Sequence, residues 1–211
     1  MVNYLLDVWY RKLKNKNFKI EFILTVIFLL IILFLFTHYL TFNERRNGVT
    51  LDDPFLVLFS PINTNWLTFV LIYGSIFTAI IYFLKTPERL MFAFQSYMLL
   101  VAVRTIAMYS IPLNPPYHTI PLIDPFVKYL GTGIQLNKDL FFSGHTATLF
   151  LLFLISENKI LKRIFLICTI AVGLSVLIQH THYTVDVIAA PFFAYGVYKI
   201  VFELRRRFLV S

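Results

Sequence analysis

Two histidines and one carboxylate are the residues of this sequence best suited to chemistry. His182 and Asp186 are four positions apart, so on a helix they share a face, where the carboxylate can orient the imidazole and stabilise its cation. Such an imidazole can act as a nucleophile. His145, which belongs to a different apolar run, could protonate a leaving alkoxide and then deprotonate an incoming hydroxyl. This combination predicts phosphoryl transfer through a phosphohistidine.

The candidate residues belong to three polar clusters within otherwise apolar stretches. Ionisable residues inside apolar spans are costly in a membrane, which makes them functional candidates. Arg104, in one cluster, could hold phosphate oxygens with its planar guanidinium. The clusters are Phe141-Phe142-Ser143-Gly144-His145-Thr146, His180-Thr181-His182-Tyr183-Thr184-Val185-Asp186 and Arg104-Thr105-Ile106-Ala107-Met108-Tyr109.

The remaining histidines have simpler interpretations. His38 and His118 are best explained as hydrogen-bonded packing residues, and for His180 an interfacial position is favoured over a second catalytic base. Two facing histidines could instead bind a metal ion, but no third ligand stands at a suitable spacing. We therefore expect neither a metal nor another cofactor, and the sequence contains no GxGxxG or Walker motif.

The composition places these clusters in a membrane protein. The chain has 211 residues, of which 58% are hydrophobic and 14% charged, and its mean hydropathy of +0.74 is too high for a soluble domain. A membrane span needs about 20 mostly apolar residues. Six apolar runs satisfy this requirement approximately, and they predict an all-α bundle of six transmembrane helices. The runs lie near 21–40, 66–84, 90–109, 140–156, 164–180 and 183–203.

Basic residues suggest how such a bundle is oriented. The formal net charge is +8, and 13 of the 19 Lys and Arg residues flank apolar runs at the two termini and in the turns after the second and fourth runs. By the positive-inside rule both termini are cytoplasmic. All three clusters then meet at the periplasmic, luminal or extracellular face. Because no basic surface interleaves with stacking aromatics, nucleic acid is not an expected partner.

The expected organisation has three parts. Residues 1–20 form a basic segment, residues 21–203 the six-helix catalytic domain, and residues 204–211 a basic cytoplasmic tail. Within 2–13, apolar residues recur at helical spacing beside basic ones, which suits either a helix lying in the membrane interface or an ordinary charged flank.

Two motifs resemble those of the type 2 phosphatidic acid phosphatase superfamily. They are Ser143-Gly144-His145 and, further along, His182-x-x-x-Asp186. The resemblance implies that His182 attacks phosphorus, that Asp186 supports it, and that His145 protonates the leaving group. The superfamily's first motif is missing, and Val176 and Phe142 stand where an arginine and a proline are usual.

Three blocks in order resemble the sphingomyelin synthase branch of that superfamily. They are D-L-x-F-S-G-H-T-x-T-L from Asp139, H-x-H-Y-T-x-D-V from His180 and R-x-x-x-M-Y from Arg104, and Asp52-Asp53-Pro54 is a weaker echo of a further acidic motif. The resemblance implies transfer of a phosphoalcohol head group from a phospholipid donor to ceramide or a diacylglycerol-type acceptor in the bilayer. The phosphate-binding candidates are Arg104, Ser143 and Gly144, with Tyr183, His180 and Asp139 as possible auxiliaries.

Two other functions compete with transfer. The same residues could hydrolyse a lipid phosphate or diphosphate with water as the acceptor. A lipid-binding scaffold or transporter is the non-enzymatic alternative, but it leaves the gathering of these polar clusters at one face without a reason.

Overall fold

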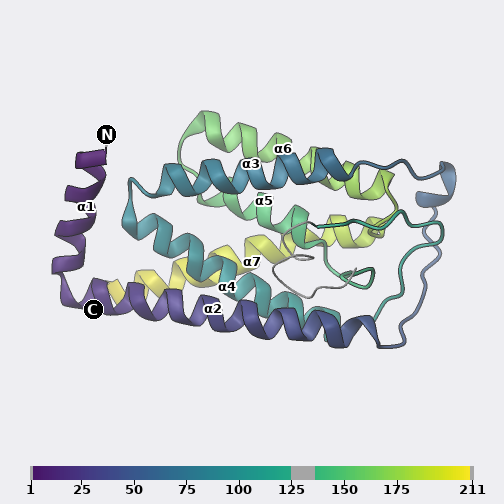
Figure 1. Cartoon of the computed structure of the whole chain (residues 1–211), viewed down its shortest axis with the longest axis horizontal. Coiled ribbons are helices and arrows are strands. Elements are labelled where there is room, and N and C mark those ends of the chain that lie inside the picture. Colours follow the sequence, from purple (N-terminus) through teal and green to yellow (C-terminus); the bar gives the residue numbers. More distant parts are fainter. Residues whose placement is uncertain (1, 125–135, 210–211) are drawn as a thin grey trace.

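The computed structural model describes residues 2–124 and 136–209, and helices make up most of them. Lys128, which lies between the third and fourth apolar runs of the sequence, is outside this range. Figure 1 shows α2 to α7 running along the long axis of the molecule, while α1 stands across one end. The helices are α1 (Val2–Lys14), α2 (Lys16–Glu44), α3 (Asn65–Phe83), α4 (Pro87–Ser110), α5 (Gly144–Ile155), α6 (Lys159–Ile178) and α7 (Thr184–Leu209), with a short 3₁₀ helix η1 (Leu56–Leu58).

Five of these helices, α2, α3, α4, α6 and α7, are long and apolar enough to cross a membrane. The all-α architecture is thus confirmed for the described residues, and the five helices suit a membrane protein, but the expected count of six full-length spans is not confirmed. α5 has only 12 residues, and at about 1.5 Å per residue it extends about 18 Å, which is less than the roughly 30 Å of a hydrocarbon core. The run at 140–156 becomes helical only at Gly144.

The late start of α5 has a specific cause in α4. The buried guanidinium of Arg104 donates hydrogen bonds to the carbonyl oxygens of Phe142 at 2.8 Å, Asp139 at 3.2 Å and Leu140 at 3.4 Å. Carbonyls that point at Arg104 are not aligned along a helix axis, so this segment is not helical and bends at Phe141 and Phe142. Ser143 then caps α5, because its side chain accepts a hydrogen bond from the Thr146 N–H.

The N-terminal basic segment forms a helix of its own. Asn15 separates α1 from α2, and its side-chain oxygen caps α2 by accepting hydrogen bonds from the N–H groups of Asn17 and Phe18. Trp9 fastens α1 to the bundle by donating from its indole N–H to the Leu84 carbonyl at 2.9 Å. Whether α1 lies in a membrane interface stays a prediction.

The core of the bundle is built around α5. Ala147 and Leu149 are fully buried, and the ring of Phe142, just before α5, stacks on Phe193 of α7 with a centroid distance of 4.3 Å. By contrast, most apolar side chains of α2 remain exposed, as expected for a helix that faces lipid.

The two ends of the bundle differ in character. Both termini lie at one end, and the loops that follow α2 and α4 gather at the other. The C-terminal end of α4 and the first turns of α5 and α7 face the loop-covered end (Figure 1). The predicted meeting of the three polar clusters is therefore confirmed, whereas the side of the membrane that this end faces stays a prediction.

Candidate active site

Backbone hydrogen bonds join the two histidine-containing segments. The Ser143 N–H donates to the Asp186 carbonyl at 3.1 Å, which ties the start of α5 to the first turn of α7. Before α7, the N–H and hydroxyl of Thr181 both donate to the Val176 carbonyl, at 3.0 and 3.1 Å. These bonds hold the turn between α6 and α7, and with it His182, in a fixed position beside α5.

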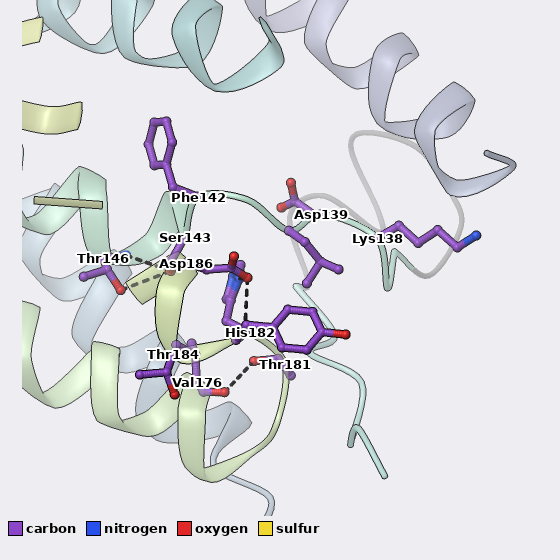
Figure 2. A network of polar contacts seen from close by, with 12 residues as sticks. Lys138, Asp139, Phe142, Ser143, Thr146, Val176, Thr181, His182, Thr184 and Asp186 are labelled. Carbon is purple, nitrogen blue, oxygen red and sulfur yellow. Dashed lines mark hydrogen bonds and ion pairs between the residues drawn. The ribbon is translucent and has the colours of Figure 1, made fainter. Parts of the chain in front are cut away.

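His182 and Asp186 form the pair that their spacing predicts. The Nδ1 atom of His182 lies 3.2 Å from Oδ2 of Asp186 (Figure 2), and the same oxygen accepts the Tyr183 N–H at 3.1 Å. His182 is 2% exposed and Asp186 is fully buried. With Nδ1 bound to the carboxylate, Nε2 is the ring nitrogen left to react with a substrate.

His145 and His182 both line a cavity of about 270 Å³. The centroids of the two imidazole rings are 6.4 Å apart. The Nδ1 atom of His145 is buried and has no hydrogen-bond partner among the described residues. A buried polar atom without a protein partner is rare, which makes His145, as a residue of the cavity lining, a candidate for proton exchange with a bound ligand.

Arg104 lines the same cavity, but its guanidinium is already engaged. Besides its bonds to the carbonyls of the 139–142 segment, Nη1 lies 2.8 Å from Oδ1 of Asp139 in an ion pair. Arg104 can take this position only because residue 144 is a glycine: a Cβ atom at residue 144 would lie 2.7 Å from Cζ of Arg104. Arg104 therefore fixes the conformation of the segment that precedes His145. Its binding of a phosphate stays a prediction.

The remaining predicted residues lie around this centre. Gly144 and Asp139 line the cavity, whereas Ser143, Tyr183 and His180 do not. The hydroxyl of Tyr183 donates to the Asn114 carbonyl at 2.9 Å and accepts the Leu51 N–H at 3.1 Å. His180 has a left-handed backbone with φ of 56°, and its ring meets the edge of Phe59, as for a packing residue.

Asp53 is a site residue that sequence reasoning largely missed. Its carboxylate accepts hydrogen bonds from the N–H and hydroxyl of Thr184, at 2.6 and 3.0 Å, and from the Phe55 N–H at 3.0 Å. Burial raises the pKa of Asp53, but these hydrogen bonds outweigh it and leave the pKa below its ordinary value. Because Thr184 is the first residue of α7, Asp53 fixes the turn that carries His182 and Asp186. The only sign of this role in the sequence was the weak match of Asp52-Asp53-Pro54 to a short acidic motif of the sphingomyelin synthase family.

Within residues 2–124 and 136–209, no group of three or more His, Cys, Asp or Glu side chains has the arrangement of a metal site. The two facing histidines thus lack, among these residues, the third ligand that the metal interpretation requires.

A comparison with known protein families finds a match in the part of the chain that contains both histidines. Residues 138–203 match the family described as PAP2 superfamily C-terminal. The match supports the type 2 phosphatidic acid phosphatase superfamily, and with it lipid phosphatase or phosphotransferase chemistry. It spans His145, His182 and Asp186 but not Arg104, and it does not single out the sphingomyelin synthase branch. No curated protein matches the chain.

Proposed function

We propose that this protein is an integral membrane, sphingomyelin synthase-like enzyme that transfers a phosphoalcohol head group from a phospholipid to ceramide or a similar lipid hydroxyl. One observation carries the proposal: His145 and His182 line one cavity with their ring centroids 6.4 Å apart, and His182 is paired with the buried carboxylate of Asp186. A nucleophile and a proton donor beside the same cavity are what a two-step displacement at phosphorus requires.

In the first step, Nε2 of His182 attacks the phosphorus of the donor lipid. The bond from phosphorus to the diacylglycerol oxygen breaks, and protonated His145 gives its proton to that oxygen. Asp186 stabilises the positive charge that develops on His182, since its Oδ2 atom lies 3.2 Å from Nδ1. The products are diacylglycerol and a phosphohistidine that carries the head group.

In this scheme Arg104 neutralises the negative charge on the phosphate oxygens. Its Nη1 atom is paired with Asp139, and both residues line the cavity. An incoming phosphate therefore takes the place of the Asp139 carboxylate as the partner of Nη1. The bonds from Nε and Nη2 to the 139–142 carbonyls keep the guanidinium in place during that exchange.

In the second step, neutral His145 takes the proton of the acceptor hydroxyl. The hydroxyl oxygen attacks the phosphohistidine, the phosphorus–nitrogen bond breaks, and the head group leaves on the acceptor. Water in place of the lipid hydroxyl turns the same sequence into hydrolysis. The family match favours that second candidate equally, because it covers both kinds of chemistry. Following the positive-inside rule, we place the site on the non-cytoplasmic face.

The test uses purified protein and a phospholipid labelled in its head group, with and without ceramide. We expect a labelled phosphosphingolipid that requires both ceramide and His182, and loss of turnover in His182→Ala. The matched control is His38→Ala, since His38 is exposed on α2 and bonds only to the Phe34 carbonyl of its own helix. Labelled phosphoalcohol or phosphate formed regardless of ceramide would establish hydrolysis instead. Full activity of His182→Ala would refute the phosphohistidine.

A further inference from the structure

A second cavity lies at the end of the bundle opposite to the histidines. Its volume of about 780 Å³ exceeds the roughly 270 Å³ of the catalytic cavity. Residues of α1 and of the first turns of α2 and α4 line it together with the last turns of α5 and α7. Its apolar wall consists of Phe18, Met91, Phe92, Ile155, Tyr198 and Phe202.

Charged side chains surround this apolar wall. The lining contains four basic residues, Lys12, Arg89, Arg205 and Arg206, and three acidic ones, Glu21, Glu88 and Glu157. The cavity therefore has both a hydrocarbon-like wall and an excess of positive charge, which is the combination that a phospholipid head group and its glycerol region require.

Two of the basic residues are held by weak partners. Arg89 is paired with Glu157, but the Glu157 side chain is 75% exposed while that of Arg89 is only 20% exposed. Arg206 is paired with Glu203, and both of these side chains are well exposed. Exposed ion pairs contribute little stability, so a phosphate can replace either glutamate at little cost.

Arg205 has a different role from its neighbours. Its Nη1 donates to Glu21 at 3.1 Å and to Gln95 at 2.8 Å, and Gln95 in turn donates to Glu21 at 3.0 Å. This network satisfies the Arg205 guanidinium inside the bundle. Lys12 is paired with Glu88, and both of these side chains are about half exposed, so this pair is as weak as those of Arg89 and Arg206. Lys12, Arg89 and Arg206 are therefore the basic residues that can exchange a glutamate for a ligand phosphate.

The position of α1 places the cavity at the level of lipid head groups. Figure 1 shows α1 crossing the end of the bundle at a steep angle to the long helices, so when these helices span a bilayer α1 lies along its surface. Leu6 and Tyr10 of α1 are exposed beside Arg11, Lys12 and Lys14, as expected for a helix in contact with head groups.

We propose that this cavity binds the head group of an anionic phospholipid from the leaflet at the basic end of the bundle. Arg89, Arg206 and Lys12 contact the phosphate, and the glycerol and first acyl carbons lie on Phe18, Phe92 and Phe202. The proposal does not depend on the reaction at the histidines, because the two cavities are at opposite ends.

The experiment measures thermal unfolding of the full chain in detergent micelles that contain phosphatidylglycerol, phosphatidylcholine or only added inorganic phosphate. A ligand that binds only the folded state raises the melting temperature by an amount that grows with the logarithm of its concentration relative to its dissociation constant. We expect phosphatidylglycerol to raise it in the wild type, and phosphatidylcholine to raise it less. In Arg89→Gln/Arg206→Gln, the apparent affinity for phosphatidylglycerol should fall at least tenfold.

The matched control is Lys159→Gln/Arg163→Gln. It removes the same charge from exposed positions of α6 at the same end, outside the cavity lining, and it should keep the wild-type response. Arg206→Gln alone provides a second variant if the double variant fails to fold, because the Arg206 side chain is 65% exposed. An equal loss in the control, or an equal response to both lipids, would overturn the proposal. A full response to inorganic phosphate alone would reduce the cavity to a simple anion site and overturn the lipid assignment.

Discussion

Replacing Gly144 by alanine tests how closely the candidate active site is packed. A Cβ atom at this position would lie 2.7 Å from Cζ, 2.8 Å from Nε and 2.9 Å from Nη1 of Arg104. Non-bonded carbon atoms prefer separations of about 3.5–4.0 Å, so the guanidinium must move by about 1 Å. Arg104 is 6% exposed and bonded to the 139–142 carbonyls, so it cannot move without breaking these bonds.

A Gly→Ala substitution in a helix normally stabilises a protein, but at residue 144 we expect it to destabilise. Alanine is favoured over glycine within a helix by about 1 kcal/mol. Crowding a buried contact costs about 1–3 kcal/mol, so Gly144→Ala should destabilise the protein by up to about 2 kcal/mol. If the proposed transfer operates, a displacement of about 1 Å beside His145 should also lower turnover roughly 10²-fold.

The assay combines melting temperatures with turnover of the labelled phospholipid. Gly74→Ala in α3 and Gly196→Ala in α7 are the matched controls, because a Cβ atom at either position meets no atom within 4 Å. Both should leave stability unchanged or raise it, and both should remain active. A Gly144→Ala protein as stable and as active as these controls would refute the close contact between Gly144 and Arg104.

Three further substitutions test the turn before α7. Asp53→Asn should lower the melting temperature at pH 7: the folded-state pKa of Asp53 lies below its ordinary value, so its stabilising contribution is present above the unfolded pKa. The difference from wild type should shrink below about pH 4, as the pH falls through the folded-state pKa, and a constant difference in a melting series would contradict the charge effect. Tyr183→Phe leaves the half-buried Asn114 carbonyl and Leu51 N–H without their hydroxyl partner and should cost about 1 kcal/mol in chemical denaturation; an unchanged midpoint would argue against the contact. Asp186→Asn should lower kcat of the proposed reaction roughly 10²–10⁴-fold with a smaller change in KM, whereas a change confined to KM would contradict its support of the His182 cation.

Much of the architecture could be predicted from local patterns. Long apolar runs predict helices because each span must satisfy its own backbone hydrogen bonds, and the four-residue spacing of His182 and Asp186 places both on one side of a single turn. The meeting of the polar clusters also followed from simple alternation of helix direction. These inferences need only neighbouring residues and the order of the runs.

Contacts between distant residues could not be predicted in the same way. The late start of α5 depends on Arg104 reaching carbonyls more than thirty positions away, and hydropathy does not encode such a contact. The bond from Asp53 to Thr184 spans 131 positions, so an acidic residue in an outer loop gave no sign of its partner. The capping role of Ser143 was not predicted either: the sequence suggested phosphate binding for Ser143 and a helical run that begins near residue 140, although serine is a common N-cap.

The position of Arg104 along α4 has a consequence for how the proposed reaction responds to the surrounding bilayer. α4 continues for six residues beyond Arg104, to Ser110, which at about 1.5 Å per residue is about 9 Å. In the proposed reaction, the donor phosphate must therefore move from the end of α4 toward the middle of the bilayer to reach Arg104. A thinner bilayer shortens that movement, because its head groups lie closer to the midplane. Turnover should consequently rise as the acyl chains of the surrounding lipid are shortened, which makes membrane thickness itself a determinant of the rate.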